Sequence, residues 1–248
     1  MGCKLRTLAI AVGLGIGLFG WTGGAEAATL RWFGHAFFLV TSPQGVRVAL
    51  DPFGDIGYPL PDVAADIVTV SHGHGDHNNP DLLTGAPVVL RGLMAGGADW
   101  NAIDHRTKDV RITALPAYHD DVRGRSRGLN SIFIVEIGGL RLAHLSDIGH
   151  TLSAETLEDM GRIDILLVPV GGIFSIDGRQ AIDIMTRLRP AITIPIHYKT
   201  AATATWPIKD ESIFLGGLNN VRRLDATTFS VTPETLPDRP EVWVMQYR

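Results

Sequence analysis

The chain has 248 residues, a formal net charge of −4 and 45% hydrophobic residues, with 28 glycines and 14 prolines. This balance is typical of a loop-rich globular protein and excludes a fibrous or disordered chain. Lys and Arg are nowhere dense enough to follow a phosphate backbone, so we expect no nucleic-acid partner.

Residues 1–27 are predicted to form a cleaved signal peptide. Two basic residues begin it, residues 8–19 form an apolar run, and Ala25-Glu26-Ala27 supplies the small-x-small cleavage pattern. An uncleaved anchor is the competing interpretation, but an apolar run of about 12 residues is shorter than the roughly 20 that span a bilayer. We therefore expect a periplasmic or secreted protein that is cut after Ala27 and has no stable membrane anchor.

Cys3 is the only cysteine of the sequence, and it lies inside this leader. The mature chain can therefore form no disulfide and no thiolate metal site. A transition-metal site in it would have to be built from imidazole and carboxylate groups, which favours hydrolytic chemistry.

Residues 28–248 show no linker, repeat or low-complexity segment and are predicted to form one domain. Apolar, β-branched runs predict short strands, and the capping residues Ser153 and Asp177 predict two helices. A further helix is expected near Asn79, with Pro80 at its first position. The strands are expected at 30–40, 46–50, 66–71, 111–118, 132–137, 140–145, 163–170 and 191–196. Strands outnumber helices, so the class is a layered α/β domain.

A cluster of potential metal ligands follows the predicted strand 66–71 directly. Its members are His72, His74, Asp76 and His77, with a glycine on each side of His74. Two histidines at i and i+2 can face one metal, whereas the adjacent Asp76 and His77 suit a second metal nearby. Imidazole with carboxylate favours zinc, with manganese or iron as substitutes. We therefore expect two divalent metal ions, and we expect the two glycines to give the loop freedom and room.

Further ligands are expected at the ends of other strands. His119 follows the strand 111–118, Asp147 follows 140–145, and His197 follows 191–196. A lone histidine at a strand end is more often structural. Here the predicted site already needs more ligands, and three strand-end residues can provide them.

With these motifs the chain resembles the metallo-β-lactamase superfamily, whose hallmark loop is His-x-His-x-Asp-His. It is most similar to a branch of Zn-dependent hydrolases related to L-ascorbate phosphate lactonase. The branch motifs are Trp32-Phe33-Gly34-His35-Ala36, Leu50-Asp51-Pro52, Ala117-Tyr118-His119, Gly128-Leu129-Asn130, the segment 144–150, Pro169-Val170-Gly171-Gly172 and the segment 195–200.

The resemblance implies a four-layer αββα sandwich with the metals at one edge between two sheets. It implies one metal on His72, His74 and His119, a second on Asp76, His77 and His197, and a bridging Asp147. Two residues also distinguish this chain within the superfamily. Ser146 stands where the family usually has glycine, and His74 stands where di-iron redox relatives usually have glutamate.

These ligands predict a metal-dependent hydrolase that acts through a metal-bridging hydroxide on an ester, lactone, amide or phosphodiester of a small molecule. The alternatives are a phosphodiesterase or phospholipase, and an exported metal-binding protein without turnover. Asp76, His150 and Lys199 are the candidate catalytic side chains. Asp76 would hold the hydroxide, His150 would orient Asp147 or give a proton to the leaving group, and Lys199 would meet an anionic substrate.

Other residues have open roles. His35 and His144 are as readily core residues as site residues, and Asp51 is expected to fix a turn below the site. Arg123, Arg125 and Arg127 could select a phosphate or carboxylate, although a solvated loop is the favoured interpretation. Trp206 is expected to be a packing residue, as are Trp32 and Trp100. The pocket, and with it the choice of substrate, is expected to depend on loops at 52–62, 91–110 and 200–212.

Overall fold

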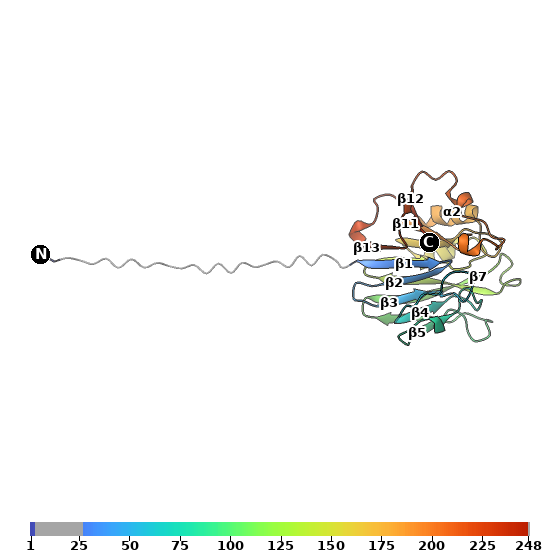
Figure 1. Cartoon of the computed structure of the whole chain (residues 1–248), viewed down its shortest axis with the longest axis horizontal. Helices are drawn as coiled ribbons and strands as arrows, with labels where there is room; N and C mark the ends of the chain where they lie inside the picture. Colours follow the sequence, from blue (N-terminus) through green and yellow to red (C-terminus); the bar gives the residue numbers. More distant parts are fainter. Residues whose placement is uncertain (3–26, 248) are drawn as a thin grey trace.

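A computed structural model describes residues 1–2 and 27–247 (Figure 1). Almost all of the predicted signal peptide therefore lies outside the described residues. In the part of the chain that is described, no helix has the length and apolar character needed to cross a membrane.

Two β-sheets form the body of the protein. Figure 1 shows β1 to β5 following one another across the first sheet. In spatial order this sheet consists of β13 (Thr228–Val231), β1 (Ala28–Gly34), β2 (Phe37–Thr41), β3 (Arg47–Leu50), β4 (Ile67–Val70) and β5 (Val88–Arg91). The second consists of β12 (Val221–Leu224), β14 (Glu241–Met245), β11 (Ile192–Ile196), β10 (Ile165–Pro169), β9 (Leu140–His144), β8 (Leu129–Ile137), β7 (Val110–Tyr118) and β6 (Asp104–Thr107).

The main hydrophobic core lies between the sheets. It joins inward residues of the first sheet, such as Phe38 and Ile67, to residues of the second, such as Ile112 and Phe133. Each of these side chains is at most 2% exposed. Burial on this scale stabilises by roughly 1.5 to 3 kcal/mol for each large apolar side chain, which makes the sandwich the rigid support of the loops at its edge.

The few helices lie beside the eight-stranded sheet. They are α1 (Ala154–Met160), α2 (Gly178–Leu188) and α3 (Ser212–Leu215), and α2 contacts both α3 and β10. The outer face of the other sheet holds a smaller core with Phe37, Phe53 and Tyr58, covered by the segment 53–65 and the 3-10 turn η1 (Pro80–Leu82). Two further 3-10 turns are η2 (Ala201–Thr203) and η3 (Pro233–Thr235). The predicted layered α/β class is confirmed, with a thin outer layer over the first sheet.

Local sequence signals place several elements correctly. Asp177 begins α2 through a full capping box with Gln180, and the Ser153 hydroxyl accepts the backbone N–H of Thr156 at the start of α1. Gly138 and Gly139 have φ of 55° and 80°, as the tight turn between β8 and β9 requires. Each of these signals depends only on residues that are neighbours in the sequence, so it can be recognised without knowledge of the tertiary structure.

Two expectations were wrong. The predicted single strand 30–40 is a hairpin of β1 and β2, which turns at Gly34 and His35 with φ of 111° and 52°. A side chain at Gly34 would meet the Tyr58 ring at 2.2 Å, so only glycine fits there. The helix expected near Asn79 is only the 3-10 turn η1, because Asn79 makes no side-chain capping bond.

The parallel strands place the candidate metal ligands at one edge of the sandwich. β10 runs parallel to both β9 and β11, and β3 runs parallel to β4. The carboxyl ends of parallel strands meet at the same edge of a sheet. The segments that follow β4, β7, β9 and β11 therefore converge there.

Candidate metal centre

The loop that follows β4 supplies four potential ligands. His72 and His77 are buried, Asp76 is partly buried, and His74 is exposed. The glycines around His74 were expected to be needed for freedom and room. Instead, both lie outside the positive-φ region, and a side chain at either would meet no atom within 4 Å.

The first group of ligand atoms belongs to His72, His74 and His119. These atoms all lie within 4.8 Å of one another, and His72 Nε2 is 3.1 Å from His74 Nδ1. His119 comes from the end of β7, far from the other two in sequence. The loop after β4 and the end of β7 therefore bring three imidazoles together, as the prediction of ligands at strand ends requires.

The second group contains Asp76, His77 and His197, together with His35. Asp76 Oδ2 lies 3.6 Å from His77 Nε2 and 3.9 Å from His197 Nε2. His35 Nε2 contacts the same carboxylate oxygen at 3.2 Å. His35 is fully buried in the turn between β1 and β2, so the residue left undecided by the sequence is part of this cluster.

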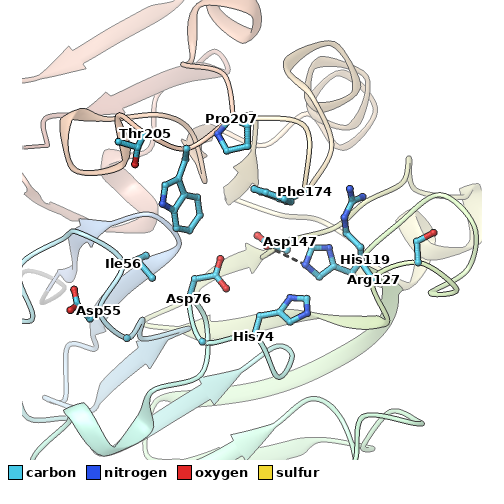
Figure 2. Close-up of a pocket in the computed structure, with 14 residues that line it drawn as sticks. Asp55, Ile56, His74, Asp76, His119, Arg127, Asp147, Phe174, Thr205 and Pro207 are labelled. Atoms are coloured by element: carbon cyan, nitrogen blue, oxygen red, sulfur yellow. Dashed lines mark ion pairs between the residues drawn. The ribbon is translucent and has the colours of Figure 1, made fainter.

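Asp147 lies between the two groups. Its Oδ1 is 3.1 Å from His77 Nε2, and its Oδ2 is 3.1 Å from His197 Nε2 and 3.4 Å from His119 Nε2. Figure 2 shows Asp147 next to His119 at the floor of the pocket. One carboxylate thus faces both groups, as a bridging ligand would.

The donor atoms fit a metal. His77 Nε2, His197 Nε2 and Asp147 Oδ1 are buried and face one another, yet within the described residues none makes a hydrogen bond. An unsatisfied buried polar atom costs about 1 to 3 kcal/mol, so several together need another partner. Imidazole nitrogens and carboxylate oxygens are the donors that Zn²⁺ and similar divalent ions prefer.

The electrostatics favour the ligating forms of His72 and Asp147. For His77, burial is outweighed by the Asp147 and Asp76 carboxylates, which raise its pKa well above 6.5. Burial, with the neighbouring charge of His77, lowers the pKa of His72 well below 6.5, which keeps the imidazole neutral. Burial alone would raise the pKa of Asp147, but His197 and His77 outweigh it and hold that pKa well below 3.8. A neutral imidazole and an ionised carboxylate are the forms that bind metals.

Asp51 holds the cluster from below. It accepts hydrogen bonds from His77 Nδ1 at 2.9 Å, from the Ser71 backbone N–H at 2.9 Å and from the hydroxyls of Ser71 and Ser146 at 2.5 Å. His72 Nδ1 lies 2.9 Å from the Ser71 hydroxyl. His77 and His72 thus use Nδ1 for support, which leaves Nε2 of each ring for a metal.

The charge state of Asp51 suits this role. Its burial would raise its pKa, but the hydrogen bond from His77 and the nearby imidazoles outweigh burial and lower the pKa to about 2. Ser146, the residue that departs from the family pattern, directs its hydroxyl at Asp51 and does not line the pocket. The extra side chain is therefore accommodated below the site.

A pocket of about 800 Å³ opens above the cluster. Figure 2 shows its walls, with Asp55 and Ile56 on one side and Arg127 and Phe174 on the other. Its floor contains His74, Asp76, His119 and Asp147, and its remaining lining residues are Gly54, Gly75, Ser126, Thr205, Trp206 and Pro207. The predicted loops at 52–62 and 200–212 contribute, whereas 91–110 does not.

Of the three candidate catalytic residues, only Asp76 lies in the pocket. His150 Nε2 accepts the backbone N–H of Tyr118, and its Nδ1 contacts the Thr151 carbonyl, so both ring nitrogens are already used. Lys199 is half-buried, with its backbone N–H bonded to the Lys209 carbonyl. The structure therefore brings neither His150 nor Lys199 to the cluster.

Two residues near the pocket differ from their expected roles. Trp206 was expected only to pack, but its side chain lines the pocket. Arg127 was favoured as a solvated residue, and it too lines the pocket. Neither position carries a sequence signal, because a lone tryptophan or arginine on a loop is usually structural or solvated. His144 is buried near Asp51, with Nδ1 4.0 Å from its carboxylate.

The chain is similar to several known proteins. The model of the beta-lactamase superfamily domain matches residues 29–197. A metal-dependent hydrolase of Archaeoglobus fulgidus is 30% identical over 200 residues, which are 69% of this chain and 83% of that protein. Another from Carboxydothermus hydrogenoformans is 31% identical over 201 residues, covering 72% of this chain and 86% of that protein.

A solved structure has a similar fold. The crystal structure of a Zn-dependent hydrolase of the metallo-beta-lactamase superfamily from Thermotoga maritima matches with a TM-score of 0.71 and 29% sequence identity. The match covers 89% of this chain and 100% of that chain.

Proposed function

The chain belongs to the beta-lactamase superfamily and is a metal-dependent hydrolase, and on that premise we propose that it cleaves an ester, lactone, amide or phosphodiester of a small molecule with two bound divalent ions. Zinc is the proposed metal, with Mn²⁺ or Fe²⁺ as substitutes. The observation that carries the proposal is the place of Asp147, whose two carboxylate oxygens face imidazoles of both ligand groups.

We assign one ion to His72, His74 and His119, and the other to Asp76, His77 and His197, with Asp147 as the bridge. When bound, two such ions supply a water whose pKa is lowered from about 15.7 towards about 7, and they polarise the oxygen of the scissile group. Asp51 and Ser71 hold the Nδ1 atoms of His77 and His72, so that Nε2 of each ring would be available to an ion. The support keeps the ligands in place before substrate arrives.

Asp76 is the proposed catalytic carboxylate. Its contacts with His35, His77 and His197 all use Oδ2. We assign Oδ1 the task of accepting a hydrogen bond from the attacking water, which fixes the direction of attack. The buried His35 contacts Oδ2 and keeps the carboxylate from turning. The reaction needs no covalent bond between enzyme and substrate.

The test combines metal analysis with a substrate panel. We expect close to two equivalents of metal in the purified protein, and hydrolysis that is lost on treatment with a chelator and restored by Zn²⁺. The panel contains lactones, 4-nitrophenyl esters, bis-4-nitrophenyl phosphate and nitrocefin, and separates carbonyl from phosphodiester chemistry. Tight metal binding without any chelator-sensitive hydrolysis would replace the proposal with a metal-binding protein that lacks turnover.

A further inference from the structure

The loop between β7 and β8 is rigidly held beside the metal centre. The carboxylate of Asp120, the first residue after His119, accepts four backbone N–H groups of this loop at 2.7 to 2.9 Å. The donors are Val122, Gly124, Ser126 and Arg127. The His119 backbone N–H also bonds to the Gly128 carbonyl at 3.1 Å, which closes the loop on the metal ligand.

Arg127 projects from this loop into the pocket. In Figure 2 its side chain rises beside His119 towards Phe174. Its guanidinium carbon lies 5.9 Å from the centre of the Phe174 ring. Among the described residues that line the pocket, it is the only Lys or Arg, and no carboxylate pairs with it in the described part of the chain.

The neighbouring arginines serve as a contrast. Arg125 donates its Nε–H to the Val122 carbonyl of its own loop, and neither Arg123 nor Arg125 lines the pocket. The three cations lie at alternate positions of one loop, but only one is directed at the metal centre. Loop charge alone therefore does not explain the position of Arg127.

The wall beside Arg127 is apolar and aromatic. Phe174 and Trp206 meet edge to face, with ring centres 6.3 Å apart, and Ile56 and Pro207 continue the surface. Phe174 is positioned by a strained turn. Its N–H bonds to the Gly172 carbonyl at 2.7 Å, and Ile173 between them has φ of 64°. A β-branched residue rarely adopts positive φ, and such strain is typical of functional sites.

We propose that Arg127, with Phe174 and Trp206, selects substrates in which an oxyanion such as carboxylate or phosphate is attached to an apolar or aromatic group. This inference rests on the proposed hydrolase function and names the substrate class of that site. The guanidinium receives the oxyanion, and the two rings cover the apolar part while the scissile bond lies over the metal ligands. Because the loop is already held by Asp120, little conformational entropy is lost when the anion binds.

A binding experiment tests the anion site without turnover. Benzenesulfonate is an oxyanion that binds metals weakly, and methyl phenyl sulfone is its neutral counterpart. We expect the protein to bind benzenesulfonate at least about tenfold more tightly in isothermal titration calorimetry, as one charge-assisted hydrogen bond requires. Equal affinity for the two probes would overturn the proposal.

Two matched variants locate the site. Arg127→Met should lower the affinity for benzenesulfonate by about tenfold or more and leave that for the sulfone unchanged. Arg125→Met removes the same charge from the same loop and should change neither. Phe174→Ala should weaken both probes, because it removes the shared apolar surface. An equal loss of benzenesulfonate affinity in the two arginine variants would mean that the positive charge of the loop as a whole attracts the anion. That result would reject Arg127 as the residue that selects it.

A hydrolysis experiment separates this inference from the proposed function. The substrates are mono-4-nitrophenyl succinate and 4-nitrophenyl butyrate, which share a leaving group and differ in one carboxylate. Arg127→Met should raise KM for the succinate ester about tenfold more than KM for the butyrate ester, with the selective loss in KM and not in kcat. If wild type and Arg127→Met have the same KM and kcat for both esters, the anion site is rejected while the hydrolase proposal is retained. If neither ester nor the wider panel is cleaved but the calorimetry holds, the hydrolase proposal fails and the anion site stands.

Discussion

Two of the candidate ligand histidines have a partner for the ring nitrogen that faces away from the cluster. His77 gives Nδ1 to the Asp51 carboxylate, and His72 gives Nδ1 to the Ser71 hydroxyl. This support fixes the tautomer and the ring orientation before a metal arrives. The metal affinity of the site therefore depends on residues that touch no metal.

Replacing His197 tests the ligand set. His197→Ala should lower the metal content by about one equivalent and reduce turnover at least about 100-fold, since even the loss of a supporting partner costs 10- to 100-fold. Plasma emission spectroscopy and initial rates measure the two effects. His105→Ala is the matched control, because His105 lies on β6 outside the cluster and pocket. Full metal content and full activity in His197→Ala would remove this residue from the site.

Ser146 allows a test of backbone strain against hydrogen bonding. Its φ is 51°, and its hydroxyl donates to the buried Asp51. Ser146→Ala should destabilise the protein by about 1.5 to 3 kcal/mol, the usual value for a hydrogen bond to a charged group. Ser146→Gly loses the same bond but recovers about 1 kcal/mol, because glycine accepts positive φ readily. In urea denaturation, Ser146→Gly should have a larger free energy of unfolding than Ser146→Ala. The reverse order would contradict the strain argument.

At the scale of elements, short parallel strands decide where the ligands meet. β4, β9 and β11 are almost fully buried, and the candidate ligands His72, Asp147 and His197 follow them within three residues of the strand end. A change in strand register would displace every ligand behind it, because side chains alternate between the two faces of a strand.

An ion pair ties β3 to β4 and gives a pH-dependent contribution to stability. The Arg47 guanidinium and backbone N–H bond to the Asp66 carboxylate, and they lower its pKa below 3.8 against the opposing effect of burial. A lowered folded-state pKa adds stability above the unfolded value, which is lost as the pH falls through the folded value. The pair is partly exposed, so the contribution is at most about 1 kcal/mol.

Asp66→Asn should therefore be less stable than the wild type at pH 7, and this difference should shrink below pH 3.8. Urea midpoints measured from pH 3 to pH 7 on metal-free protein give the comparison. A difference that stays constant through the acid range would mean that ionisation of the Asp66 carboxylate adds no stability.

Strands at the sheet margins could not be predicted from the sequence. β5, β6, β12 and β13 have four residues each and lie at or near the edges of their sheets, where most of their side chains are exposed or half-buried. Such strands show little of the apolar pattern that identifies a buried strand. Their pairing depends on neighbours that are distant in sequence.

At the scale of the whole molecule, we propose that the protein is exported and that its mature chain starts at Ala28. Ala28 is the first residue of β1, is 1% exposed and pairs with Val231 of β13. Cleavage after Ala27 would thus leave the sheet complete.

Amino-terminal sequencing of the protein purified from a bacterial host checks this proposal. We expect the mature sequence Ala28-Thr29-Leu30, recovered from the periplasm or medium. Replacing Ala25 and Ala27 by bulkier residues should block cleavage, because the peptidase requires small side chains there. Recovery of an uncut chain from the cytoplasm would contradict export.

The sequence by itself predicted which side chains form the cluster. Six imidazole and carboxylate candidates follow from residue type and from position at strand ends, and the bridging role of Asp147 follows from the family resemblance. The fold class follows for the same reason, since buried strands and capped helices are encoded by local patterns. These signals do not depend on which distant segments meet.

Tertiary structure alone decided the support and the pocket. Asp51 and Ser146 lie 95 residues apart, and their contact below His77 becomes visible only when β3 and β9 are placed in space. Arg127, Phe174 and Trp206 come from three separate loops, each without a periodic pattern. Side-chain convergence of this kind depends on long-range packing, which local propensity does not encode.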